Sequence, residues 1–202
     1  MRNTLEEIVL KYSHGNTELE SVEIDKEHFK ELLIKYLNDK NSSTLRQDVM
    51  CEVAGVKSNP NKLGYDGEDT TDEMKPKNVR TTNPKLKKLD GCGNYTDMTF
   101  KRHKAFYDQD AKIHVGGFID GEHVFQLSVP YREMSEHFEN QLKKRLPNGD
   151  QPTQYLRSMN FSLTQIKKCK NVSLTYITQK LESYRGHITK PLYTYLTKLQ
   201  EA

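Results

Sequence analysis

The segment from residue 113 to residue 129 constrains the fold more than any other part of the sequence. Residues 113–119 and 124–129 are rich in β-branched and aromatic side chains, and Asp120-Gly121 between them favours a tight turn. We therefore expect a β-hairpin. Apolar residues occupy both faces of these strands, which is typical of a sheet that is covered on both sides. A sheet of this kind needs helices around it.

Helical patterns lie on either side of this hairpin in the sequence. Asp25 and either Ser43 or Thr44 are candidate N-caps, and Gly55 is a candidate helix end. A further strand is expected over residues 172–177. Apolar residues recur at helical spacing in five segments, which are residues 4–12, 27–37, 45–54, 131–142 and 191–199.

These elements predict one domain of class α/β (α+β), with a mixed β-sheet flanked by helices over residues 1–202. We divide it into a helical N-terminal part (1–40), a core that carries the candidate site (44–130), and C-terminal helices with one strand (131–202). Residues 80–97 contain Asn-Pro and Gly-Cys-Gly-Asn motifs and are expected to form a long basic loop.

The composition argues against two classes of protein. The chain has no run of 18 apolar residues, so no membrane span is expected. Residues 1–7 lack the apolar core of a signal peptide, so an intracellular, cytoplasmic protein is expected. The three cysteines are widely spaced and predict free thiols in a reducing compartment instead of a disulfide framework or a zinc site.

The net charge of +3 conceals a strong asymmetry along the chain. Residues 1–74 contain nine Lys or Arg against 16 Asp or Glu, whereas residues 75–104 contain nine against two. A basic block directly after an acidic cluster suits a protein that binds phosphate beside a metal ion. A solvated loop with lysines for solubility is the alternative.

The acidic cluster contains the clearest candidate for a functional site. Residues 69–72 are polar enough to form a four-residue turn between two strands. Paired residues and alternate residues of such a hairpin share a face. The apolar face would then carry Leu63, Tyr65 and Met74, and the polar face would carry Asp66, Glu68, Glu73 and Lys75.

Clustered carboxylates repel one another unless a cation lies between them. Their hard oxygens suit Mg²⁺, which binds one or two carboxylates together with waters and phosphate oxygens. We expect Asp66, Glu73 and Glu68 to hold the metal, which would acidify a water molecule. Lys75 would position or help deprotonate that water and offset phosphate charge. The residues indicate hydrolysis of a phosphodiester.

The pattern Asp66-x6-Glu73-x-Lys75, with the apolar Met74 between the last two, resembles the PD-(D/E)XK nuclease superfamily. This superfamily includes type II restriction endonucleases and mismatch-repair nicking endonucleases. The resemblance covers about residues 45–80, and Tyr65 replaces the proline of the motif. It implies a restriction-endonuclease-like sheet, cleavage of double-stranded DNA, and a supporting role for Glu52 on the preceding helix. Asp110-Ala111-Lys112 repeats the acid-x-Lys pattern, but in a polar loop.

The basic block is expected to contact the phosphate backbone of DNA, which positions the protein without reading sequence. The candidate residues are Lys77, Arg80, Lys85, Lys87, Lys88, Lys101, Arg102 and Lys104.

The sequence thus predicts a magnesium-dependent endonuclease that cuts double-stranded DNA at a specific short site. A repair or recombination nuclease that reads DNA structure, and a DNA-binding protein without catalysis, are the alternatives. An acidic surface hairpin or a calcium-binding turn would explain the same residues locally. One chain offers one catalytic segment, so a homodimer with one segment per DNA strand is expected, with residues 4–12 and 27–37 as its apolar surface.

Overall fold

The computed structural model describes residues 43–59, 65–82, 87–151 and 153–201, together with residues 27, 30, 33, 34, 36 and 37. In order, the elements are α3 (Ser43–Ala54), β1 (Asp72–Val79), β2 (Gly93–Met98), α4 (Phe100–Asp108), β3 (Lys112–Ile119), β4 (Glu122–Pro130), α5 (Tyr131–Arg145), β5 (Leu156–Phe161), α6 (Leu163–Ile166), β6 (Ser173–Ile177), the 3-10 helix η1 (Leu181–His187) and α7 (Lys190–Glu201).

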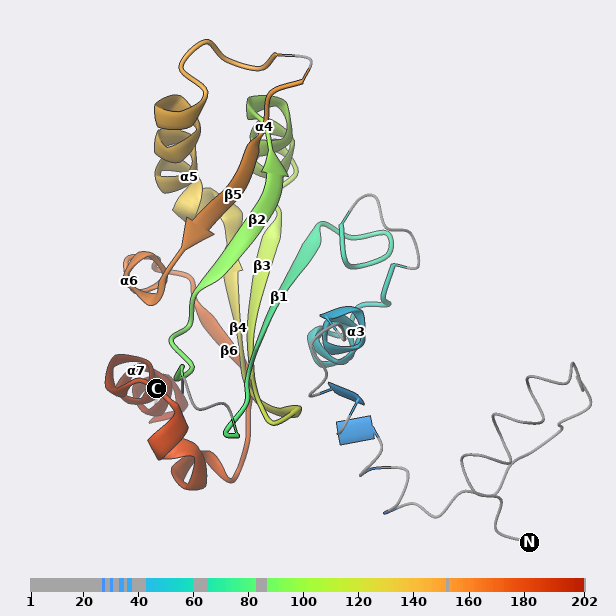
Figure 1. Cartoon of the computed structure of the whole chain (residues 1–202), viewed down its shortest axis with the longest axis vertical. Helices are drawn as coiled ribbons and strands as arrows, with labels where there is room; N and C mark the ends of the chain where they lie inside the picture. The colour runs from blue at the N-terminus through green and yellow to red at the C-terminus, as the bar shows by residue number, and fades with distance from the viewer. Residues whose placement is uncertain are drawn as a thin grey trace, which may run out of the picture.

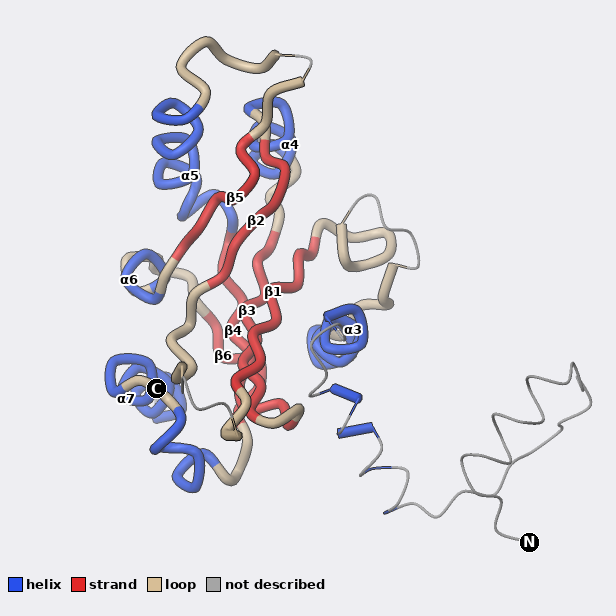
Figure 2. The backbone as a smooth tube through the Cα atoms, viewed as in Figure 1, coloured by secondary structure: helices blue, strands red, loops and turns tan. Residues whose placement is uncertain are grey.

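A mixed four-stranded sheet in the order β1-β3-β4-β6 forms the centre of the fold. Strand β1 runs parallel to β3, whereas β4 is antiparallel to both β3 and β6. Strands β2 and β5 form a separate antiparallel pair (Figure 1). Helix α3 lies on one side of the sheet, and α5, α6 and α7 lie on the other (Figure 2). The predicted mixed sheet flanked by helices is confirmed.

Both faces of the sheet are buried, as the apolar pattern of the hairpin predicted. On the α3 face, Met50 and Cys51 pack with Met74 of β1 and Phe118 of β3, all at most 1% exposed. The opposite face belongs to a larger cluster of apolar residues from every other part of the described fold. Burial of one such side chain contributes about 1.5–3 kcal/mol. Strand β1 is therefore held from both sides.

A buried polar network on the α3 face of the sheet connects β1 to β3, β4 and α3. The Asp72 carboxylate lies 2.6 Å from Nε2 of His114 on β3. Gln126 of β4 lies 3.4 Å from the other ring nitrogen of His114 and donates a hydrogen bond to the Met50 carbonyl at 3.1 Å. Three strands and one helix share this network, which fixes the position where β1 begins.

The predicted hairpin is present as β3 and β4, with Asp120 and Gly121 both at positive φ in its turn. The predicted helix before Gly55, the helix through residues 131–142, the strand over 172–177 and the C-terminal helix are also confirmed. Residues 27–37 are helical wherever they are described, and residues 4–12 lie outside the described residues. None of the described helices is long and apolar enough to cross a membrane.

Two local predictions are wrong. Residues 66–75 do not form a hairpin, because β1 begins only at Asp72 and pairs with β3 in parallel. Residues 80–97 are not entirely a loop, because β2 begins at Gly93 and pairs with β5. In both cases the true partner strand is distant in sequence, so a local pattern could not reveal it.

A substitution at Gly117, which lies at the β-bulge between Gly117 and Phe118, tests this packing. A Cβ atom at Gly117 would lie 2.1 Å from the ring of Phe125, whereas at Gly186 it would meet nothing within 4 Å. We expect Gly117→Ala to lower the free energy of unfolding by about 1–3 kcal/mol, because a ring in a packed core cannot move aside freely. Gly186→Ala should change it by less than about 0.5 kcal/mol. Urea denaturation of the two variants measures the difference, and equal stabilities would contradict the packing.

Candidate active site

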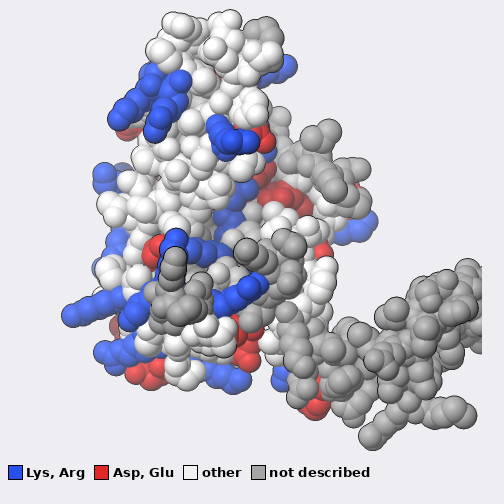
Figure 3. Space-filling view, viewed as in Figure 1, with Lys and Arg blue, Asp and Glu red and all other residues white. Residues whose placement is uncertain are grey.

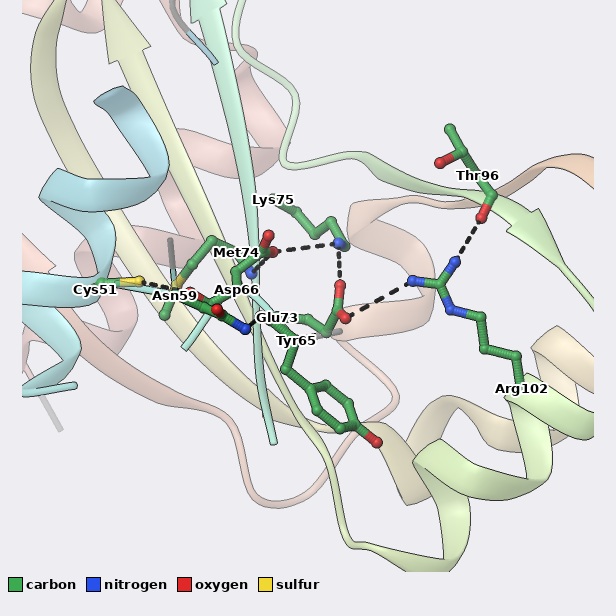
Figure 4. A network of polar contacts seen from close by, with 9 residues as sticks. All are labelled: Cys51, Asn59, Tyr65, Asp66, Glu73, Met74, Lys75, Thr96 and Arg102. Atoms are coloured by element: carbon green, nitrogen blue, oxygen red, sulfur yellow. Dashed lines mark hydrogen bonds and ion pairs between the residues drawn. The ribbon is translucent and has the colours of Figure 1, made fainter. Parts of the chain in front are cut away.

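The alternation of β1 sends neighbouring side chains to opposite faces of the sheet. Met74 points into the α3 cluster, as predicted. Glu73 and Lys75 point the other way, toward β2 and α4 (Figure 4). The ammonium of Lys75 lies 4.4 Å from the centre of the Tyr95 ring on β2. The two residues of the predicted triplet therefore face a space that is bounded by β2 and α4.

Asp66 reaches the same place from the loop before β1, without belonging to a strand. The loop is anchored to the segment that follows α3: the backbone N–H of Asn59 donates to the Asp66 carbonyl at 2.8 Å, and the Asn59 side chain donates to the Tyr65 carbonyl at 2.9 Å. The thiol of Cys51 lies 3.7 Å from the same Asp66 carbonyl. These contacts turn the Asp66 side chain toward β1.

Lys75 joins the two carboxylates. Its ammonium lies 2.5 Å from Oε2 of Glu73 and 3.8 Å from Oδ2 of Asp66. The same oxygen of Asp66 accepts a hydrogen bond from the backbone N–H of Met74 at 2.7 Å. The structure thus brings Asp66, Glu73 and Lys75 together, although the hairpin expected to do so is absent.

Glu73 is the most deeply buried member of this group, with its side chain only 3% exposed. Burial raises the pKa of its carboxyl and Asp66 adds to the rise, whereas Lys75 opposes it. Oε1 of Glu73 is buried and makes no hydrogen bond with any described residue. An inaccessible carboxylate oxygen without a donor is costly unless a cation or a donor binds there.

Arg102 completes the charged cluster from α4. Its guanidinium lies 4.0 Å from Oε1 of Glu73, too far for a hydrogen bond, and donates to the Thr96 carbonyl at 3.1 Å. The sequence predicted Arg102 only as a DNA contact and assigned no role to Thr96. Thr99 is a sequence signal for the start of α4, because threonine is a common N-cap residue. In the structure it caps α4 by accepting a hydrogen bond from the Arg102 backbone N–H at 3.1 Å.

The other predicted acids point elsewhere. Glu68 pairs with Lys57 at 2.6 Å, on the side of the loop that faces the end of α3. Glu52 is exposed on α3, next to Cys51, which is the helix residue that contacts the Asp66 loop. The predicted grouping of either acid with Asp66 and Glu73 is therefore not seen. Glu68 pairs with Lys57 instead, and Glu52 follows Cys51 on α3, where successive residues face different directions.

The predicted DNA contacts are spread around this cluster. Lys77 lies two residues beyond Lys75 on the same face of β1 and pairs with Asp90 at 2.6 Å. Arg80 follows β1, and Lys85 lies outside the described residues. Four more are exposed cations, of which Lys104 pairs with Asp108: Lys87, Lys88, Lys101 and Lys104.

The donor set fits a magnesium ion that is held by two carboxylates. Among the described residues, no group of three or more His, Cys, Asp or Glu side chains is suited to hold a metal ion. Mg²⁺ does not need such a group, because waters and substrate oxygens complete its coordination. The carboxylates of Asp66 and Glu73 are the candidate ligands; here Lys75 lies between them, and the Glu73 oxygen that accepts no hydrogen bond faces Arg102.

Comparisons with known proteins assign no family to this site. No protein-family model matches the chain, and no curated protein matches it significantly.

The buried charge of Glu73 predicts how stability depends on pH. A carboxyl whose pKa is raised by folding stabilises the folded state below its unfolded pKa and loses that contribution as the pH rises through its folded pKa. Glu73→Gln keeps the shape and removes the charge. We therefore expect a higher Tm than wild type at pH 8, and a difference that shrinks as the pH falls. Thermal denaturation from pH 4 to pH 8 measures this.

Glu136→Gln on the exposed side of α5 is the matched control, and it should leave Tm unchanged. A lower Tm for Glu73→Gln at pH 8 would mean that the Lys75 ion pair outweighs the desolvation of the carboxylate.

Proposed function

We propose that this chain is a magnesium-dependent endonuclease that hydrolyses phosphodiester bonds of double-stranded DNA. One observation carries the proposal: Asp66 and Glu73 arrive from a loop and a strand at the same lysine, and Glu73 has a buried oxygen that accepts no hydrogen bond from a described residue. Buried carboxyls whose pKa is raised by desolvation, as that of Glu73 is, are concentrated at catalytic sites. A purely structural ion pair would be expected to satisfy both oxygens.

Each charged residue of the site has a separate role in the proposed hydrolysis. Asp66 and Glu73 would hold Mg²⁺, which when bound acidifies water and neutralises charge on phosphate. Lys75 orients a water molecule toward the phosphorus through its ammonium, while both carboxylates restrict where that ammonium can lie. Arg102 donates to phosphate oxygens as negative charge develops, because its guanidinium has donors that neither Glu73 nor Thr96 uses.

The surface charge around the site favours a polyanionic substrate. Acidic and basic side chains lie together between β2 and the loop before β1 in the space-filling view (Figure 3). Lys77 lies on β1 two residues beyond Lys75, and Arg102 reaches Glu73 from α4. A duplex that lies along these elements would place its phosphates against cations while one scissile bond meets Lys75.

The class of target is a further part of the proposal. We propose cleavage at a specific short sequence, as type II restriction enzymes perform, with a structure-specific repair or recombination nuclease as the alternative. Digestion of phage DNA distinguishes them, because only sequence recognition gives discrete bands. A binding protein without catalysis would produce no magnesium-dependent cleavage at all.

The proposed roles of Asp66, Glu73 and Lys75 predict how substitutions of these residues change cleavage activity. Asp66→Asn, Glu73→Gln and Lys75→Met should each lower cleavage of plasmid DNA at least about 100-fold, because each removes a charged group at the reacting phosphate. EDTA should abolish wild-type cleavage. The measurement is the initial rate of plasmid linearisation in Mg²⁺, with circular dichroism to confirm the fold of each variant.

Asp108→Asn and Glu136→Gln, which alter exposed acids of α4 and α5, are matched controls and should cleave normally. Wild-type rates in Glu73→Gln or Lys75→Met would refute the assignment. Loss of activity in Glu68→Gln combined with an active Asp66→Asn would move the first metal ligand to Glu68.

We also propose that the active species is a homodimer with one site per DNA strand. Leu33 and Tyr36, in the segment predicted as the dimer surface, are 37% and 60% exposed. Sedimentation with uncleaved DNA in Ca²⁺ should show two chains per duplex, and mapped cuts should be symmetric about a twofold axis. One chain per duplex with asymmetric cuts would refute the dimer but leave the nuclease proposal intact. Leu33→Asp with Tyr36→Asp should weaken the dimer.

A further inference from the structure

A basic pocket lies between α7 and the segment that leads into β2. Its volume is about 540 Å³, and its charged lining consists of Lys88, Arg185, Lys190 and Lys198 against one acid, Glu201. On α7, Lys190, Thr194 and Lys198 recur every four residues and therefore share one face. Leu192 and Leu196 anchor the opposite face in the core.

Three of these cations have no counter-charge of their own. Arg185 pairs with Glu182 at 3.1 Å, but Lys88, Lys190 and Lys198 make no side-chain ion pair or hydrogen bond with any described residue. All three are exposed. Unpaired like charges around one cavity repel one another, and an anion in the cavity would remove that repulsion. The pocket therefore has the charge pattern of an anion site.

The basic surface extends beyond a single pocket. A second cavity of about 420 Å³ adjoins the first: it shares Thr194 and Lys198 with it and adds Lys167 and Lys170. Figure 3 shows many Lys and Arg side chains over this end of the molecule. Two adjoining basic cavities suit an anion with repeated charges better than one small phosphate.

The pocket is connected to the candidate active site by short links. Leu89 forms a parallel bridge with Ile188 just before α7, with hydrogen bonds of 2.9 and 2.8 Å to the flanking residues. The next residue, Asp90, pairs with Lys77 of β1 at 2.6 Å. Lys77 is two residues from Lys75, and each extended residue spans about 3.3 Å. A nucleic acid strand that is bound at Lys75 can therefore continue past Lys77 and Lys88 to α7.

We propose that the α7 pocket binds backbone phosphates of the nucleic acid strand that runs from the candidate active site. The identity of that strand rests on the proposed endonuclease function, but the presence of a polynucleotide phosphate site does not. The pocket contributes affinity and register and no base recognition, because it offers lysine ammonium groups to phosphate oxygens. It extends the DNA footprint from β1 to the end of the fold that carries α7 (Figure 1).

The test compares two double variants that each lose two positive charges. Lys190→Gln with Lys198→Gln alters the pocket, and Lys144→Gln with Arg145→Gln alters exposed residues at the end of α5, far from α7 in Figure 1. Fluorescence anisotropy with a 30-base-pair duplex, without metal, gives log Kd against log salt concentration. We expect the pocket variant to lose up to about 0.9 of slope per phosphate contact removed, and the control to keep the wild-type slope.

A second arm separates a polynucleotide from a small phosphorylated ligand. Titration with inorganic pyrophosphate and with a mononucleotide, followed by NMR, should show weak binding that the pocket variant loses together with the duplex slope. Equal slopes in the two variants would overturn the proposal, and so would lost mononucleotide binding with an unchanged duplex slope. If the slopes differ but the protein cleaves no DNA, the nuclease proposal is refuted and the pocket proposal stands. If the protein cleaves DNA and the slopes are equal, the pocket proposal is refuted and the nuclease proposal stands.

Discussion

The alternation of side chains along β1 is the constraint on which the site depends. One face carries Asp72 and Met74 into the α3 side of the sheet, where apolar packing and the His114 network hold them. The other face must then present Glu73 and Lys75 to β2 and α4. A slip of one residue would send both charged groups into the α3 core, at a cost of several kcal/mol for each unpaired charge. The packing of one face thus determines the chemistry of the other.

The position of Glu73 sets stability against the proposed function. Its carboxylate is buried, only one oxygen accepts a hydrogen bond, and its pKa is raised even though Lys75 is adjacent. A raised pKa means that folding is less favourable with this carboxyl ionised than with it neutral. Such an arrangement persists where a buried charge has a use, because proteins tolerate local instability at functional sites. The burial and the missing hydrogen-bond donor of Glu73 support the proposed catalytic role more strongly than the sequence motif does.

The sequence predicted the elements whose patterns are local, and it failed where pairing is distant. The β3–β4 hairpin follows from apolar strands around Asp120-Gly121, and α5 follows from its helical period. The partner of β1 could not be predicted in the same way, because the residue paired with Asp72 is Lys112, 40 positions later. Strand β2 was missed because most of its residues are polar, with Tyr95 and Met98 alone fully buried.

The membership of the site was easier to predict than its geometry. Asp66, Glu73 and Lys75 do meet, but Asp66 does so through a loop that Asn59 anchors. Arg102 comes from α4, a helix that was not predicted from the sequence. These four side chains balance one another in formal charge. A divalent cation alone would leave an excess of positive charge beside Lys75 and Arg102, and a phosphate group would offset it. On the proposed function, metal and DNA should therefore each strengthen the binding of the other, because the phosphate offsets part of the positive charge that the metal ion adds to the balanced site.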